Sequence, residues 1–173
     1  MKKQLLELRS QYLNFLRFSL DESAAATYTS LEIDTNLSAE RGIMMEIHSL
    51  EVEFTTGDLL REVAQAASEQ IMVQLTREEK AAELTFNDAD MIAKLERRIS
   101  RAATIGTDAG PLWFPSERRA IINFPLPIPY VKPSIFVGVL ATHATAGQVR
   151  GRIGYTLRDI DREEFLELLV ALQ

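Results

Sequence analysis

The chain has 173 residues, of which 46% are hydrophobic and 25% charged, and this composition is typical of a single soluble domain with its own core. The formal net charge is −6, which disfavours a protein that coats nucleic acid, and we expect no specific nucleic-acid recognition. There is no cysteine, so disulfides, thiolate metal sites and a cysteine nucleophile are excluded. No apolar run could span a bilayer and no signal-peptide pattern is visible, so we expect a soluble protein made inside a cell.

Residues 2–20 are predicted to form an amphipathic helix or arm, because their apolar side chains recur at spacings of three and four. These side chains are Leu5, Leu8, Tyr12, Phe15, Leu16 and Leu20. The segment also carries four basic residues, Lys2, Lys3, Arg9 and Arg17, against the single acidic residue Glu7. A basic and apolar terminus packs on its own domain, contacts a neighbouring subunit or lies on an anionic membrane surface. We favour packing within the protein or an oligomer.

Two strands are predicted next, over residues 27–35 and residues 43–54. The apolar alternation of the second strand changes phase within the strand. Its apolar residues are Ile43, Met45 and Ile47 before the change and Leu50, Val52 and Phe54 after it. One face can stay buried through such a change only if an extra residue is inserted. We therefore predict a β-bulge or a sharp bend near His48 and Ser49.

The middle of the chain is predicted to carry one or two inserted helices among short strands. Residues 58–70 have the spacing of a short helix, and a second helix is predicted from Asn87 or Asp88 to about Ala103. The apolar stripe of this second helix is Met91, Ile92, Leu95 and Ile99. Short strands are predicted over residues 71–76 and 82–86. Residues 104–119 are rich in turn formers and predict a long surface loop anchored by Trp113.

The last third of the chain predicts antiparallel strands. Residues 134–142 are apolar on both faces, as in a strand covered on both sides, whereas residues 148–158 alternate between apolar and polar side chains. The short connection between them favours a hairpin. Gly151 and Gly154 predict a bulge or a close approach of neighbouring backbone.

Three alternating prolines precede these strands, and a helix is predicted after them. Because proline has no amide hydrogen, the segment that holds Pro125, Pro127 and Pro129 is predicted to be an extended edge or crossover strand. Asp161 and Glu164 have the spacing of a capping box at the start of a C-terminal amphipathic helix. Its apolar face is Phe165, Leu168, Leu169 and Leu172.

The sequence thus predicts a mainly β protein, an antiparallel β-sandwich with amphipathic helices at both ends and one or two inserted helices. We divide it into an N-terminal helical arm (1–22), a β-sandwich (23–160) and a C-terminal helix (161–173) that packs on the domain or on a neighbour.

The sequence predicts no catalytic, cofactor-binding or metal site. A metal centre would have to draw on five residues, Glu46, His48, Glu51, Glu53 and His143, and we favour solvated strand and loop positions for them. Three serines, Ser10, Ser49 and Ser134, lack the hydrolase G-x-S-x-G pattern, and Gly106 and Gly110 match no phosphate-binding loop. The carboxylate pairs Glu32 with Asp34 and Asp159 with Asp161 are interpreted as surface charge.

Arg150, Arg152 and Arg158 lie on the polar face of the strand predicted over residues 148–158. Such a row can bind a phosphate or the carboxylate of a partner. We favour a solvated sheet face, or pairing with acidic residues on the next strand, and the role of the three arginines stays open.

Three segments resemble the small single jelly-roll major capsid proteins of tailless icosahedral viruses, especially the sphaerolipovirus-like proteins of internal-membrane phages and archaeal viruses. The segments are EIDTNLSAERGIMMEIHSLEVEF (32–54), FPLPIPYVKPSIFVGVLA (124–141) and VRGRIGYTLRDIDREEFLELL (149–169). The resemblance implies an eight-stranded single jelly roll whose copies tile a shell and have no enzymatic activity.

From this resemblance we expect a structural virion protein, a self-assembling capsid subunit that is synthesised in the host cytoplasm and located in the virion. The implied partners are other copies of the chain and, where one is present, a second capsid protein. The basic N-terminal arm would contact a membrane or a neighbouring subunit. The lack of a strongly basic arm fits a shell over a lipid layer, or over a genome packed by separate machinery. Two alternatives stay open: a non-viral β-sandwich interaction module that forms a small closed oligomer, and a cupin-like metalloenzyme that uses His48 and His143.

Overall fold

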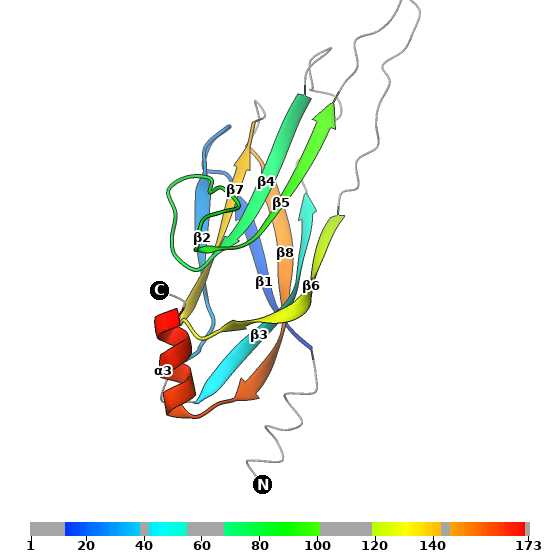
Figure 1. Ribbon diagram of the computed structural model, residues 1–173. Helices are drawn as coiled ribbons and strands as arrows, with labels where there is room; N and C mark the ends of the chain where they lie inside the picture. Colours follow the sequence, from blue (N-terminus) through cyan, green and yellow to red (C-terminus); the bar gives the residue numbers. More distant parts are fainter. Residues whose placement is uncertain (1–12, 39–41, 55–67, 101–118, 143–145, 172–173) are drawn as a thin grey trace, which may run out of the picture.

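The computed structural model describes residues 13–38, 42–54, 68–100, 119–142 and 146–171 (Figure 1). Within these ranges the chain forms eight strands and one helix. They are β1 (Asn14–Asp21), β2 (Thr29–Asp34), β3 (Ile43–Phe54), β4 (Ser68–Thr76), β5 (Met91–Ser100), β6 (Arg119–Tyr130), β7 (Ser134–Ala141), β8 (Gln148–Asp159) and α3 (Arg162–Ala171). The prediction of a mainly β protein is confirmed.

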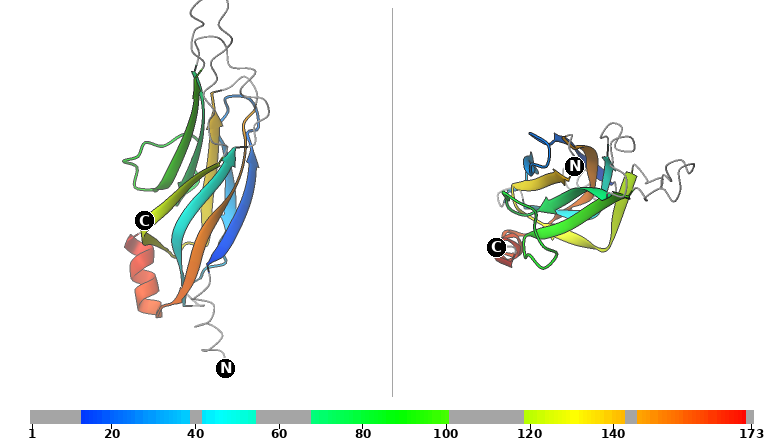
Figure 2. Two further views of the ribbon diagram at one scale, coloured as in Figure 1. Left: turned by 90° about the vertical axis from the view of Figure 1, so that its right-hand side faces the viewer. Right: turned by 90° about the horizontal axis from the view of Figure 1, so that it is seen from above.

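The strands form two four-stranded sheets, and every pair of neighbours is antiparallel. The order is β1-β8-β3-β6 in the first sheet, which we call sheet A, and β2-β7-β4-β5 in the second, which we call sheet B. Figure 2 shows the two sheets as layers that face each other. The architecture is therefore β-sandwich-like.

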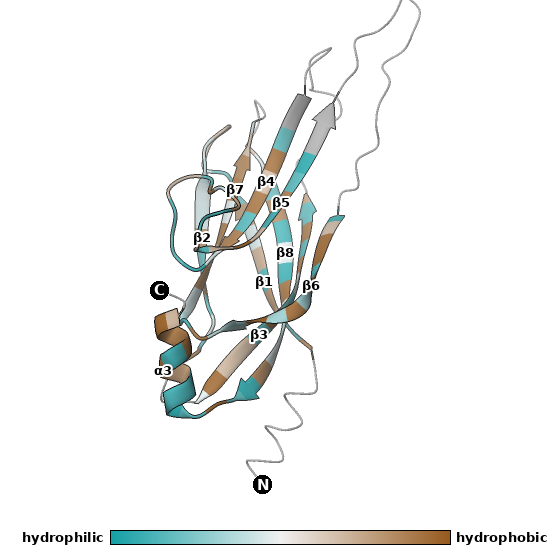
Figure 3. Ribbon diagram, viewed as in Figure 1, coloured by the Kyte–Doolittle hydropathy of each residue, from teal (hydrophilic) through white to brown (hydrophobic). Residues whose placement is uncertain are grey.

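The core lies between the two sheets, where alternate side chains of each strand point inward. Sheet A contributes Ile47, Leu50, Val52, Val149 and Ile153, and sheet B contributes Val73, Leu75, Val137 and Val139; all nine are buried. Apolar and polar residues alternate along much of β8, whereas β7 is apolar on both faces (Figure 3). Burial of each such side chain stabilises the fold by about 1.5–3 kcal/mol relative to exposure.

Strand β3 contains the predicted irregularity. Its register with both β6 and β8 shifts between Ile47 and Ser49, so His48 is the extra residue of a bulge. Ile47 before the shift and Leu50 after it are both fully buried. The bulge therefore keeps one face of a long strand in the core although its alternation changes phase.

Strand β6 is an edge strand of sheet A, as the prolines predict. Its pairing with β3 jumps from Asn123 to Ile128, which leaves residues 124–127 outside the ladder. Two of the prolines, Pro125 and Pro127, lie in this unpaired stretch. Their missing amide hydrogens therefore remove no hydrogen bond from the ladder.

The predicted N-terminal helix is wrong over residues 14–20, because these residues belong to β1, which pairs with β8. Phe18 and Leu20 point into the core, while Arg17 and Ser19 are exposed. An apolar pair four residues apart, such as Leu16 and Leu20, satisfies both the helical and the strand period, and the pairing with β8 decides between them. Residues 1–12 of the predicted arm lie outside the described ranges.

The helix predicted from residue 87 or 88 to about residue 103 is also wrong, because strand β5 occupies residues 91–100. Ala93 pairs with Leu75 and Leu95 pairs with Val73 across the β4–β5 ladder. Both β5 side chains pack toward the core, so the period of two prevails. The inserted helix predicted over residues 58–70 lies mostly outside the described ranges, and its last three residues begin β4. The predicted loop at 104–119 also lies outside, except for Arg119, which opens β6.

Residues 82–86, predicted to be a strand, belong instead to a loop between β4 and β5. The buried side chain of Gln74 holds this loop: its amide donates to the carbonyl of Ala82 at 3.3 Å, and its oxygen accepts from the amide of Leu84 at 2.9 Å. The same amide donates to the Tyr28 hydroxyl at 2.7 Å. Tyr28 and the loop thus cover part of the outer face of sheet B.

The predicted hairpin between β7 and β8 is wrong, because β7 lies in sheet B and β8 in sheet A. The connection therefore crosses from one sheet to the other, which a short polar segment with a glycine permits equally well. The buried side chain of Glu22, just after β1, accepts hydrogen bonds from the amides of Ala141 and Gly147 at the two ends of the crossing.

Helix α3 packs on its own domain, through Phe165 against Met44, Val131 and Ile160. An Asp161 side-chain oxygen accepts from the Glu164 amide at 2.8 Å, as predicted for the cap. Within the described ranges, no helix combines the length and the apolar composition that crossing a membrane would require.

Candidate interaction surface

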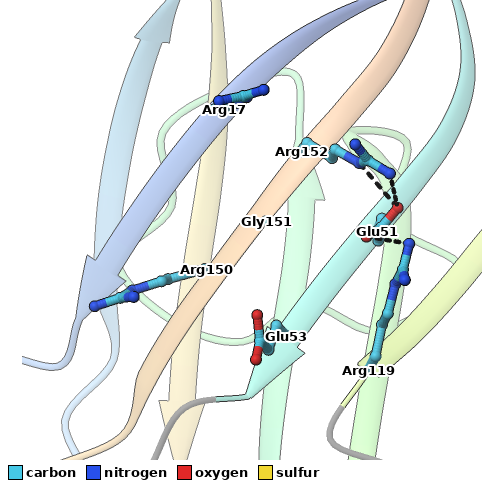
Figure 4. Close-up of a pocket in the computed structure, with 7 residues that line it drawn as sticks. All are labelled: Arg17, Glu51, Glu53, Arg119, Arg150, Gly151 and Arg152. Atoms are coloured by element: carbon cyan, nitrogen blue, oxygen red, sulfur yellow. Dashed lines mark hydrogen bonds and ion pairs between the residues drawn. The ribbon is translucent and has the colours of Figure 1, made fainter.

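A cluster of charged residues lies on the outer face of sheet A, at the end where β8 begins and β3 ends. Four strands contribute to it in two rows of paired positions. The first row, across β1, β8 and β3, is Arg17, Arg152 and Glu51. The second row, across β8, β3 and β6, is Arg150, Glu53 and Arg119. Side chains at paired positions lie on the same face of a sheet. We call these six residues the arginine face; they line a hollow of about 310 Å³ (Figure 4).

Glu51 lies at the centre of the ion pairs in the arginine face. One of its oxygens accepts from Nε and Nη2 of Arg152 at 2.9 and 2.8 Å, and the other lies 2.5 Å from Nη2 of Arg119. The hydrogen bond from Arg119, together with that from Arg152, lowers the pKa of the Glu51 carboxyl below its ordinary value. The Arg152 guanidinium also lies over the Phe15 ring, 4.4 Å from its centroid.

Arg17 and Arg150 are exposed and form no ion pair with any residue of the described ranges. Glu53 lies opposite Arg150 in the register but does not reach it within ion-pair distance. Four guanidinium groups therefore face two carboxylates, which leaves a surplus of two positive charges in a chain whose net charge is −6. This surplus makes the arginine face a candidate surface for an acidic partner.

Replacement of Glu51 by glutamine is expected to lower the free energy of unfolding by about 1 kcal/mol at neutral pH, because Arg119 and Arg152 lose their shared partner. A carboxyl whose folded pKa is lowered stabilises the protein above its unfolded pKa, about 4.3, and this contribution disappears as the pH falls through the folded pKa. Denaturation of both proteins across the acid range should therefore show the difference closing with acidification. Glu53→Gln is the matched control and should leave stability unchanged; an equal loss in the control would refute the pairing.

Arg158 lies apart from the other two arginines of the predicted row. It pairs with Glu46 at 3.6 Å and with Glu164 of α3, at the opposite end of β8. The interpretation that these arginines meet acidic residues on the next strand is confirmed for Arg152 and Arg158. Arg17 and Arg119 were not predicted, because Arg17 was assigned to a helix and Arg119 to a loop.

Of the histidine and carboxylate candidates for a metal centre, Glu46 and His48 are brought together in the described part of the chain by the Thr156 hydroxyl, which donates to Glu46 at 3.4 Å. Nε2 of His48 lies 2.8 Å from the Thr156 hydroxyl, and Glu51 is bound by two arginines. No group of three or more potential ligands occurs among the residues that the structure describes, and His143 is not one of these residues.

Four of the serine and paired-carboxylate candidates, Ser134, Glu32, Asp34 and Asp161, have structural contacts. The Ser134 hydroxyl donates to Glu32, and Asp34 accepts from the Asn36 amide at 2.7 Å. Asp161 caps α3. Ser10, Gly106 and Gly110 lie outside the described ranges.

The fold and this surface define a β-sandwich-like protein with an exposed, positively charged hollow on one sheet. In comparisons with known proteins, no family model and no curated protein matches the chain.

Proposed function

We propose that the protein is a single jelly-roll capsid subunit, a structural virion protein that assembles with copies of itself into an icosahedral shell. The order of the strands supports this proposal most strongly. β1 pairs with β8, β2 with β7, β3 with β6 and β4 with β5. The first strand thus pairs with the last, the second with the second to last, and so on to the two middle strands. A long hairpin rolled into two sheets would produce these pairs, so they support a jelly roll, the fold of viral capsid proteins, lectins and cupins.

The interior of the sandwich favours a structural role over a cupin-like enzyme. A cupin-like metal centre would need polar ligands inside the sandwich, whereas the inward positions of β3, β4, β7 and β8 hold apolar side chains. Bound metal that is lost on His48→Ala replacement would contradict this choice.

The edges and exposed side chains of the sandwich also support assembly through defined surfaces. The prolines of β6 block one sheet edge against uncontrolled strand addition. Large apolar side chains remain exposed, for example Leu126 at 78%. Contacts between subunits would bury such side chains.

Sizing of the purified chain by multi-angle light scattering over a range of concentrations tests the proposal. We expect pentamers, hexamers or closed shells that grow with concentration. A fixed dimer or trimer at all concentrations would contradict the proposal and favour a small closed oligomer.

A further inference from the structure

Helix α3 presents a second charged surface, whose sign is opposite to that of the arginine face. Glu163, Leu166, Glu167 and Val170 follow one another at positions i, i+3, i+4 and i+7, so they lie on one side of the helix. All four are exposed, Leu166 at 46% and Val170 at 70%. We call them the outer stripe of α3, because the buried Phe165 lies on the other side of the helix.

The outer stripe is acidic and has no ion-pair partner among the residues that the structure describes. Neither Glu163 nor Glu167 forms an ion pair with the part of the chain that the structure describes. The third glutamate of the helix, Glu164, pairs with Arg158. The stripe therefore offers two unpaired carboxylates beside two exposed aliphatic side chains.

The arginine face offers the complementary set. Arg17 and Arg150 are its two cations without an ion-pair partner in the described ranges, and two exposed apolar side chains flank it, Phe15 at 39% and Ile121 at 49%. Phe15 lies two residues before Arg17 on β1, and Ile121 lies two residues after Arg119 on β6, so both point to the same side of the sheet as the arginines.

We propose that the outer stripe of α3 in one copy of the chain binds the arginine face of another copy. Arginine and carboxylate groups form charge-assisted and often bidentate hydrogen bonds, so Glu163 and Glu167 suit the two unpaired guanidinium groups. Leu166 and Val170 would cover the apolar side chains beside them.

The two surfaces cannot meet within one molecule. The arginine face lies at the start of β8, whereas α3 follows the end of β8, and a strand from Arg150 to Arg158 spans about 26 Å at about 3.3 Å per residue. Phe165 and the ion pair between Arg158 and Glu164 hold α3 at its own end of the sheet. A contact between the two surfaces therefore joins two copies.

This inference rests on the proposed function and supplies one of the contacts that a shell needs. When the stripe of each copy binds the arginine face of the next copy, the contact is head to tail and produces rings or extended arrays. When two copies bind each other reciprocally, each stripe on the other copy's arginine face, the product is a two-fold dimer. Because the contact includes exposed charges, it should weaken as salt shortens the Debye length from about 10 Å at 0.1 M to about 3 Å at 1 M.

Charge reversal on each surface tests the proposal in the full chain. The variants are Arg17→Glu with Arg150→Glu, Glu163→Arg with Glu167→Arg, and all four replacements together. Sedimentation velocity at low salt should show association weakened at least about tenfold in each double variant. The fourfold variant keeps the wild-type net charge and should regain most of the association. Thermal unfolding should be nearly unchanged in the Arg17→Glu, Arg150→Glu variant, because both side chains are exposed and have no ion-pair partner in the described structure. The variants that carry Glu163→Arg should unfold at an only slightly lower temperature, because Glu163 lies in the first turn of α3, where an acidic side chain is favoured.

Three outcomes would overturn the proposal. The first is wild-type association in either double variant, and the second is a fourfold variant that dissociates as readily as the double variants. The third is a result with inorganic phosphate: it binds the wild type but not the Arg17→Glu, Arg150→Glu variant, and it leaves the association of the wild type unaffected. The arginine face would then be a site for a small anion and not for a second copy. Variants that assemble like the wild type refute this contact but not the proposed function, whereas a wild-type chain that stays monomeric refutes both.

Discussion

Replacement of Glu22 by alanine is expected to lower the free energy of unfolding by about 3–5 kcal/mol, because two buried hydrogen bonds are lost together. Glu22 is only 5% exposed, and its carboxylate accepts hydrogen bonds from the amides of Ala141, at 2.6 Å, and Gly147. Its own amide donates to the Gly147 carbonyl at 2.8 Å. One side chain thus satisfies backbone groups at both ends of the crossing from β7 to β8. Alanine would leave two buried amides without an acceptor.

Denaturant unfolding at neutral pH measures this effect. Glu22→Gln keeps one acceptor oxygen and should cost less than alanine, while Glu79→Ala, at an exposed loop position, should change stability by no more than about 0.5 kcal/mol. A loss below about 1 kcal/mol in Glu22→Ala would show that the carboxylate does not hold the crossing.

Replacement of Gly151 by alanine is expected to lower the free energy of unfolding by about 2–3 kcal/mol. Gly151 lies in β8, between β1 and β3, and a Cβ atom there would come within 2.4 Å of Cζ of Phe18 and 2.6 Å of the backbone oxygen of Glu51. Strand propensity alone predicts the opposite sign, because glycine weakens the interior of a strand. The close approach of β3 and the Phe18 ring outweighs propensity, since backbone in the middle of a sheet cannot move aside.

A double-mutant cycle with Phe18→Leu separates the two contacts. The shorter side chain removes the ring but not the Glu51 oxygen, so Gly151→Ala should be less destabilising in that background, with a coupling of about 1 kcal/mol. A stabilising or neutral Gly151→Ala in the wild-type background would contradict the packing described for β8.

Local patterns predicted the features of this fold that depend on one strand alone. The bulge at His48 follows from a phase change in a strand that is buried on both sides of it. The proline-rich segment was predicted to be an edge or a crossover because proline lacks a donor, and β6 lies at an edge. Errors arose where the decisive contact is distant in sequence: β1 and β5 carry apolar spacings that fit a helix, and only their pairing with β8 and β4 fixes the period of two.

The same reasoning explains how much of the arginine face could be predicted. Arg150 and Arg152 were recognised because they share the polar side of one strand, and Arg152 has the acidic cross-strand partner expected of it. Arg17 and Arg119 join them only through the register of four strands that are far apart in the sequence. The crossing from β7 to β8 was missed for a related reason, because the length of a loop does not reveal whether it stays within one sheet.

Electron microscopy of the purified protein, expressed alone and concentrated, tests the central claim most directly. If the chain is a jelly-roll building block of a virus shell, the images should contain closed particles or ring-shaped capsomers assembled from this subunit. Fields that contain only separate monomers or one small closed oligomer, at every concentration and salt condition tried, would contradict it.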